Sequence, residues 1–198
     1  MDFKSIKTSH IIIGIIVILF CYTGCSYNSL VSSQEKATTS WADVEASYQR
    51  RADLIPNIVE VVKGYAKHEK ETFESVIAAR AKATQITIDA ENLTPEKLEQ
   101  FKKAQGELSA ALGRLMAVAE QYPQLASAPL YADAQAQIEG CENRILEARR
   151  KYNEAVQSYN VSVRAFPNNI FANMFGFEKM TKFEADSGAE KAPKVKFD

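Results

Sequence analysis

Apolar and small residues recur every three or four positions along most of the chain, which is the period of an α-helix and not of a β-strand. The first long stripe contains Trp41, Val44, Tyr48, Ala52, Ile55, Val59, Val62 and Ala66. It predicts a helix over about 33–66. The spacing continues through Pro56, so we favour one helix kinked at this proline. A break at "DLIP", with Asp53 as the N-cap of a new helix, is the alternative.

Three more amphipathic segments follow. One covers about 69–89 and carries Phe73, Val76, Ile77 and Arg80 to Ala83 on one side. The next begins after Thr94, a good N-cap followed by Pro95 at the first helical position, and ends at Tyr122-Pro123. Its apolar stripe contains Leu98, Phe101, Gln105, Leu108, Leu112, Leu115 and Ala119.

The longest segment opens at Ser127 or Ala128 and ends at "FPNN". Its stripe contains Tyr131, Ala134, Ile138, Cys141, Ile145, Ala148, Tyr152, Ala155, Tyr159, Ser162 and Phe166. This strict spacing is typical of a coiled-coil seam. Tyr-Asn occurs at 152–153 and again one heptad later at 159–160. We interpret these tyrosines as packed rings with their hydroxyls at the edge, and a polar layer that fixes the register is the alternative.

Each segment has one apolar stripe, so each needs a partner. We predict an all-α fold, an elongated antiparallel four-helix bundle of the up-and-down type, over residues 27–183. The apolar segment 170–177, "IFANMFGF", would cap one end of the bundle. The polar tail 184–198 is expected to be disordered.

The N-terminal region 1–25 has the pattern of an export or anchoring segment. Lys4 and Lys7 precede the apolar run 11–20, "IIIGIIVILF". The uncharged stretch 11–24 would span about 21 Å as a helix, short of the roughly 30 Å hydrocarbon core, which fits a signal peptide. The residues before Cys25 resemble the lipobox of bacterial lipoproteins, so Cys25 is a candidate for lipidation. An uncleaved signal-anchor helix is the alternative, and both place the rest of the chain outside the cytoplasm.

Composition and charge narrow the function. The formal net charge of the 198 residues is -1, which gives no field to attract nucleic acid, so no nucleic-acid partner is expected. Three cysteines and two histidines show no metal-ligand spacing. We predict no catalytic residues, no metal site and no cofactor, and the sequence leaves the oligomeric state open.

The segment 50–69, "RRADLIPNIVEVVKGYAKHE", concentrates charged and polar residues around a proline. Its candidate partner-binding residues are Arg50, Arg51, Asp53, Pro56, Asn57, Lys63, Lys67, His68 and Glu69. With Ile55, Val59 and Val62 facing inward, Arg51, Asn57, Lys63 and Lys67 are expected to face water. We favour a kinked helix with solvated charges, then a partner surface. Chemistry is least favoured, because His68-Glu69 lacks the second histidine of a metalloprotease motif.

Several of these motifs resemble the LemA family of bacterial membrane-anchored proteins. The matching words are "YNSLV" after the apolar segment, Trp41, the segment 50–69, "YP" at 122–123, "RRKYNEAVQSYN", "FPNN" and "GF", in the right order over about 27–177. The resemblance implies an N-terminal membrane anchor and an extracytoplasmic helical bundle, and it supplies no catalytic residues. One branch of the family takes part in building magnetosome membranes.

We therefore predict a membrane-anchored scaffold or adaptor of the bacterial envelope, in the inner or outer membrane, that binds unidentified envelope proteins. The alternative is an accessory protein in membrane remodelling or envelope stress. A membrane-remodelling protein would need an exposed amphipathic helix, which only 170–177 offers. An enzyme is least favoured, because the inward carboxylate and histidine ligands of bundle enzymes are missing from the sequence.

Overall fold

The computed structural model of the chain describes residues 8–88, 90 and 93–184, and these form helices without any strand. The elements are α1 (Thr8–Tyr65), α2 (Lys70–Gln85), α3 (Pro95–Glu120), α4 (Pro123–Ala126), α5 (Pro129–Arg164) and α6 (Asn168–Phe175). The all-α prediction is confirmed. The described residues form six helices where four were predicted, because the short α4 and α6 were not expected as separate helices.

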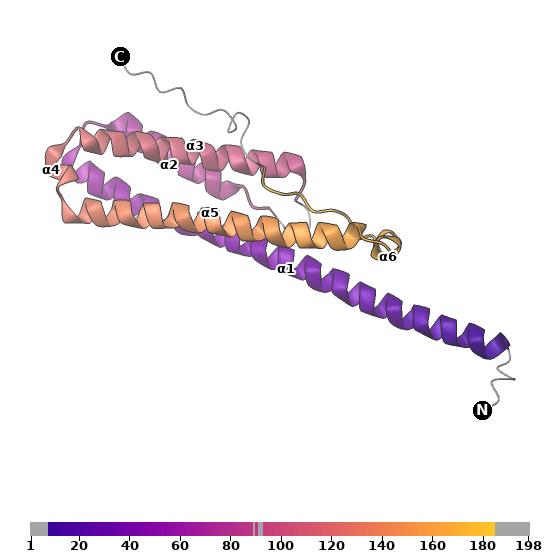
Figure 1. Cartoon of the computed structure of the whole chain (residues 1–198). Coiled ribbons are helices and arrows are strands. Elements are labelled where there is room, and N and C mark those ends of the chain that lie inside the picture. Colours follow the sequence, from indigo (N-terminus) through magenta and orange to yellow (C-terminus); the bar gives the residue numbers. More distant parts are fainter. Residues whose placement is uncertain (1–7, 89, 91–92, 185–198) are drawn as a thin grey trace, which may run out of the picture.

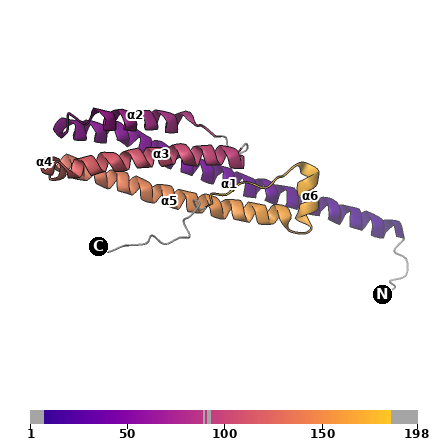
Figure 2. The same cartoon turned by 90° about the horizontal axis from the view of Figure 1, so that it is seen from above.

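Four long helices, α1, α2, α3 and α5, run lengthwise beside one another, and consecutive ones point in opposite directions (Figure 1). The most extensive contact joins α1 to α5, and the next joins α2 to α3. The N-terminal part of α1 projects beyond the other helices (Figures 1 and 2). The short α4 connects α3 to α5 at the far end, and α6 lies across α1 near the projecting part.

The prediction that the first helix starts near residue 33 is wrong, because α1 is a single helix of 58 residues that begins at Thr8. No proline separates the apolar segment from Trp41, and Gly14 and Gly24 only weaken the helix locally. The helix also continues through Pro56, so Asp53 is not an N-cap. The N-terminal apolar segment and the first helix of the body therefore form one element.

The helix ends follow local chemistry. The Thr94 side chain accepts a hydrogen bond from the backbone N–H of Lys97 at 3.3 Å, as expected of an N-cap. Helix α2 ends at Gln85, earlier than predicted, because the β-branched Ile86 leaves the helix in an extended conformation. Ile88 is buried there, and its carbonyl accepts a hydrogen bond from the Trp41 indole at 3.0 Å.

The core follows the predicted stripes of the four long helices. Trp41, which is only 1% exposed, contacts the rings of Phe101, Tyr152 and Phe183 at centroid distances of 5.7, 5.3 and 5.8 Å. Several positions predicted on the inner faces are exposed: Ile77 is 56% and Phe166 82% exposed, and Ala81 and Lys82 are exposed as well.

Along α5 the buried line moves by one position, from Ala155 and Ser162, which are only half-buried, to Val156 and Val163. A straight helix drifts in this direction relative to a seven-residue repeat.

A segment after α6 returns along α5 and is held by two asparagines one heptad apart. Asn160 exchanges two hydrogen bonds of 2.9 Å with the backbone of Met180, and Asn153 does the same with Phe183. The Tyr152 hydroxyl donates to the carbonyl of Thr181 at 2.8 Å. The Tyr-Asn pairs thus fix this segment, in addition to packing their rings. The predicted disordered tail lies outside the described residues, apart from the exposed Glu184.

Candidate functional site

The predicted partner surface lies mostly on the outer face of the C-terminal half of α1. Arg50, Asp53, Pro56, Asn57 and Lys63 are all exposed there. Lys63 forms only a solvated ion pair with Glu60 at 3.4 Å, which contributes little to stability.

Lys67 and His68 are exposed just beyond the end of α1, and Glu69 is half-buried. The Glu69 carboxylate accepts a hydrogen bond from the hydroxyl of Tyr122 at 3.2 Å. The polar residues of the segment 50–69 thus line the far end of the molecule, away from the N-terminal projection.

Arg51 is the exception: the prediction that it faces water is wrong, because it is only 1% exposed. Its guanidinium donates to Glu142 Oε1 at 2.6 Å, to Gln105 Oε1 at 2.7 Å and to Ser109 Oγ at 2.8 Å. It also lies 5.2 Å from the centroid of the Tyr48 ring, and burial raises the pKa of that tyrosine. A planar guanidinium suits this role because its donors reach several acceptors at once.

The same polar cluster extends to α2. Gln105 of α3 is buried, and its amide donates to the carbonyl of Ala83 at 3.3 Å. Ala83 lies in the last turn of α2, where carbonyls have no partner within the helix. Arg51 and Gln105 therefore link α1, α2, α3 and α5 at one level of the molecule.

Pro56 adds a second link at this level. Proline has no N–H, so it leaves the carbonyl of Ala52, four residues earlier, without its helical donor. Arg80 of α2 donates its Nε–H to that carbonyl at 2.7 Å. The ring of Pro56 itself is exposed. The proline thus leaves a backbone carbonyl of α1 free to accept a hydrogen bond from α2. This explains why the proline is tolerated inside the helix.

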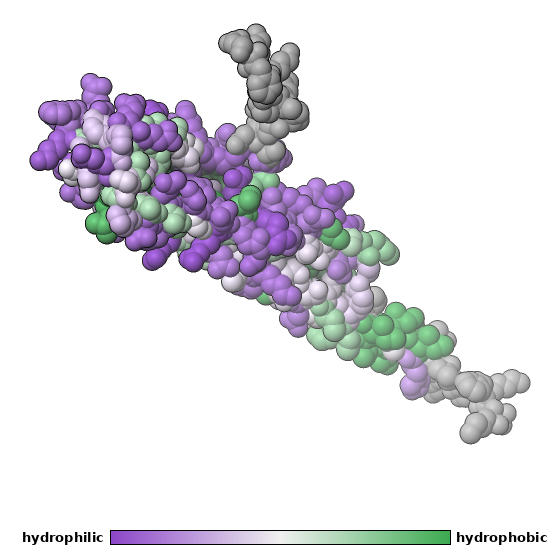
Figure 3. Space-filling model, turned by 60° about the vertical axis from the view of Figure 1, so that its left-hand side comes forward, coloured by the Kyte–Doolittle hydropathy of each residue, from purple (hydrophilic) through white to green (hydrophobic). Residues whose placement is uncertain are grey.

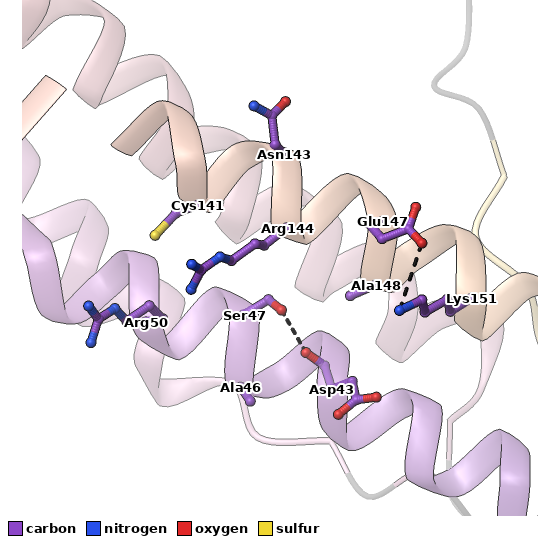
Figure 4. Close-up of a pocket in the computed structure, with 10 residues that line it drawn as sticks. All are labelled: Asp43, Ala46, Ser47, Arg50, Cys141, Asn143, Arg144, Glu147, Ala148 and Lys151. Atoms are coloured by element: carbon purple, nitrogen blue, oxygen red, sulfur yellow. Dashed lines mark hydrogen bonds and ion pairs between the residues drawn. The ribbon is translucent and has the colours of Figure 1, made fainter. Parts of the chain in front are cut away.

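A groove of about 860 Å³ with charged walls lies between α1 and α5 (Figure 4). Arg50 and Arg144 lie towards one end, beside Cys141, and Asp43 and Glu147 lie towards the other (Figure 4). Glu147 pairs with Arg150 at 2.7 Å, and that hydrogen bond holds the pKa of its carboxyl below the usual range.

Within the described residues, no three or more His, Cys, Asp or Glu side chains are grouped to hold a metal ion. The groove presents charges of both signs on an open surface, an arrangement suited to contacts with another polar surface. The buried thiol of Cys141 behaves there as a small apolar group.

The other end of α1 carries the membrane-related features. Its apolar part is long enough to cross a bilayer by length and composition, a test that a signal sequence near the N-terminus also passes. The large apolar residues between Ile11 and Val17 are 52% to 57% exposed, and Phe20 is 81% exposed. Cys25, the lipidation candidate, is exposed on α1. The next residue, Ser26, is buried against α6, and Tyr22, one turn earlier, also contacts α6.

Comparison with known families decides the identity of this architecture. The LemA family model matches residues 40–197, which is most of the chain and includes both the Arg51 cluster and the segment 50–69. The chain belongs to the LemA family.

Characterised relatives of this LemA protein include magnetosome proteins. Magnetosome protein MamQ 1 of Paramagnetospirillum magneticum is 29% identical over 179 residues, covering 80% of this chain and 64% of the relative. MamQ of Magnetospirillum gryphiswaldense is 28% identical, covering 79% and 64%. Protein LemA of Metamycoplasma hominis is 25% identical, covering 88% and 75%. This chain therefore spans less than two thirds of the length of these MamQ relatives.

The residues that sequence reasoning missed had a signal. Arg51 continues the line Val44, Tyr48, Arg51, Ile55, Ile58, whose steps of four and three match those of the stripe through Ala52. Gln105 is the one polar member of the predicted stripe of α3. A buried polar group needs a partner. One polar residue on the stripe of α1 and one on the stripe of α3 therefore predict that these two residues contact each other.

Proposed function

We propose that this LemA-family protein is a membrane-anchored scaffold whose helical body, an antiparallel four-helix bundle, holds a partner-binding surface away from the bilayer. The observation that carries the proposal is α1, one helix of 58 residues that joins the exposed apolar segment to the core. At 1.5 Å per residue it is about 87 Å long. No flexible linker separates the apolar segment from the body, so the body is held as a rigid rod.

The body is expected on the extracytoplasmic side. Lys4 and Lys7 precede the apolar segment, and positive charges before a span favour the cytoplasmic side for the N-terminus. Anchoring takes one of two forms. In one, the apolar helix stays in the inner membrane. In the other, the chain is cut before Cys25 and acyl chains on that cysteine hold it.

The surface proposed for a partner is the exposed face of α1 with Arg50, Asp53, Asn57 and Lys63, extended by Lys67 and His68. Asn57 lies 37 positions after Phe20, which corresponds to about 55 Å along the helix. A partner of mixed surface charge, itself an envelope protein, could contact this face without touching lipid. The mixed charges and the open groove beside Arg50 support a protein–protein contact better than a reaction on a small substrate.

Site-specific photocrosslinking in intact cells tests the proposal. A photoreactive residue in place of Asn57 should give a discrete crosslinked product with an envelope protein. The matched control replaces Gln100, an exposed residue of α3, and should give none. Charge reversal of Arg50 and Lys63 should reduce the product while leaving the helical content unchanged. Equal crosslinking from both positions would contradict a defined surface on α1.

The mass of the mature protein separates the two forms of anchor. A chain lacking the first 24 residues and carrying lipid identifies Cys25 as the anchor, and Cys25→Ala should then block that processing. An intact chain that retains Met1 without lipid identifies the apolar helix as the anchor. A body exposed to the cytoplasm in a protease-protection assay would overturn the proposed orientation.

A further inference from the structure

Helix α6 is fixed to α1 close to the end of the apolar segment. Ser26 donates a hydrogen bond to Asn168 Oδ1 at 2.8 Å, at the start of α6. The Tyr22 ring lies 5.8 Å from that of Phe171, and the Tyr27 ring lies 5.1 Å from that of Phe175. These contacts give α6 one position on α1.

The inner side of α6 is packed, and its outer side is mostly apolar, with the exposed Asn173 as its polar member. Ala172 is fully buried together with Leu30, Tyr159 and Val163. Four large apolar residues are exposed here, and we name them the apolar foot: Phe166 (82% exposed) just before α6, Ile170 (55%) and Met174 (62%) on its outer side, and Phe175 (46%) at its end beside Tyr27. Ile170 and Met174 are four residues apart and therefore share one face of the helix. No described helix packs over this face: α6 contacts α5 and α1 alone among the described elements.

The foot lies at the level where α1 leaves its apolar segment. From Phe20 to Ser26 the helix rises about 9 Å, so α6 is attached within two turns of the most exposed apolar part of the chain. Hydrophobic residues gather at this end of the molecule in Figure 3. If the apolar segment lies in the hydrocarbon core, Tyr22 and Tyr27 fall in the interfacial layer where tyrosine is enriched.

The direction of α6 fits that layer. Figure 2 shows α6 running across the long axis that α1 and α5 share. A helix that crosses a membrane-spanning helix in this way lies roughly parallel to the membrane surface, as interfacial amphipathic helices do. Residues 168–175 contain no charged residue, so entry into the interface desolvates no charge.

We propose that the apolar foot is embedded in the interface of the leaflet from which α1 emerges, as a second membrane contact beside the anchor. The inference rests on the proposed membrane anchoring of α1. A bilayer is the occupant because the foot is continuous with the exposed apolar segment and parallel to the surface that this segment defines. With two points of contact, the tilt of the rod is fixed, and the partner surface keeps a set height above the lipid.

The foot acts through apolar burial and not through charge, so its insertion should not require anionic lipid. A chain cut before Cys25 would lose the contact of Tyr22 with Phe171 but keep those of Ser26 and Tyr27 with α6, and acyl chains on Cys25 would enter the bilayer one residue before Ser26. In both forms of anchor, α6 lies at the lipid surface.

Depth-dependent fluorescence quenching of the full chain tests the proposal. The exposed Cys21 and Cys25 are replaced by serine, and the buried Cys141 is kept, with the background lacking a new cysteine as the labelling control. A polarity-sensitive probe is attached at Met174→Cys or, as a matched control, at Leu130→Cys, which is 70% exposed at the far end of the rod. Val17→Cys reports on the anchor itself. The protein is reconstituted into phosphatidylcholine vesicles carrying nitroxide-labelled acyl chains.

The foot should be quenched by shallow nitroxides at least about threefold more than the control position, with blue-shifted emission, and the anchor probe by deep nitroxides. A foot probe that behaves like the control while the anchor probe is quenched would overturn this proposal and leave the anchor standing. An anchor probe without quenching would overturn both. Blue-shifted emission that nitroxide lipids do not quench would mean that protein, such as a second copy, covers the foot, which also refutes the proposal.

A charge variant provides an independent arm. Ile170→Asp/Met174→Asp should abolish quenching of a probe at Phe166→Cys, and Leu130→Asp/Leu146→Asp, equally exposed substitutions on α5, should leave it unchanged. Since all four side chains point into solvent in the free protein, the circular dichroism of every variant should match the parent. Unchanged quenching in the first variant would contradict insertion of α6.

Discussion

Substitutions of Arg51 test whether the buried polar cluster holds the body together. In Arg51→Met, Gln105 Oε1 stays buried and loses its donor at 2.7 Å, which costs about 1–3 kcal/mol. The other acceptors lose less. The carboxylate of Glu142 is 46% exposed, so water replaces the arginine there. We therefore count the ion pair at no more than about 1 kcal/mol. Relief from burying a cation offsets part of the total.

Arg51→Ala should cost more than Arg51→Met, because it also leaves a cavity. Truncating a large buried side chain destabilises by about 2–5 kcal/mol, so we expect a total loss of about 3–5 kcal/mol for the alanine variant. Arg51→Lys should lose nearly as much as the methionine variant, since one ammonium cannot reach acceptors on α3 and α5 with the same fork geometry. Glu142→Gln should lose no more than about 1 kcal/mol.

Urea unfolding of the full chain in a mild nonionic detergent, followed by circular dichroism, gives these free energies. Glu139→Gln, one turn earlier on the exposed face of α5, is the matched control for Glu142→Gln. The reasoning fails if Glu142→Gln destabilises more than Arg51→Met, because the ion pair would then outweigh the bond to Gln105. It also fails if Arg51→Lys is as stable as the parent.

The remaining predictions concern the hydrogen bond from Arg80 to the carbonyl of Ala52, the segment after α6, and stability at alkaline pH. Arg80→Ala should lose about 1–3 kcal/mol in the parent but less in a Pro56→Ala background, where a new backbone N–H can serve the freed carbonyl, as a double-mutant cycle of urea midpoints would show. Alanine at both Asn153 and Asn160 should release the segment after α6, seen as faster proteolysis there with unchanged helicity. Burial raises the pKa of Tyr152, so the folded state keeps a proton that the unfolded state loses near pH 10. Stability should be full below pH 10 and fall above it by about 1.4 kcal/mol per pH unit for this group, and Tyr152→Phe should make that fall shallower.

Periodicity alone predicted the helical class and most of the buried positions of the long helices, although Leu30, Ile58 and Ala104 are among those that it missed. Helix boundaries with strong local signals were also correct, such as Thr94-Pro95 at the start of α3 and Tyr122-Pro123 after its end. Weaker boundaries were not. The start of α1 was placed too late. The change from apolar to polar residues after the N-terminal segment indicates a change in the surroundings of the helix, but it does not end the helix.

The face of a helix was less predictable than its existence. Phe166 has the right spacing for the seam of α5 and yet is exposed, because α5 ends at Arg164 and the chain turns towards α6. The spacing of the stripe on α1 allows either Arg51 or Ala52 to face the core, and Ala52 was chosen because it is the more hydrophobic of the two. In the structure both face inward, because a buried stripe about two residues wide leaves room for each.

Pro56 shows why a local rule can be right and still mislead about function. In isolation, a proline inside a helix costs about 3 kcal/mol, through one lost hydrogen bond and a crowded carbonyl. The rule places that loss at Ala52, which is buried, and so predicts an unsatisfied acceptor in the core. The structure supplies the donor from another helix, Arg80 of α2. One residue earlier, Arg51 reaches α3 and α5. The segment "RRADLIP" is therefore a junction: its buried residues fix three helices to α1, and its exposed residues, Arg50 and Asp53, lie on a part of α1 that is held in place from the inside.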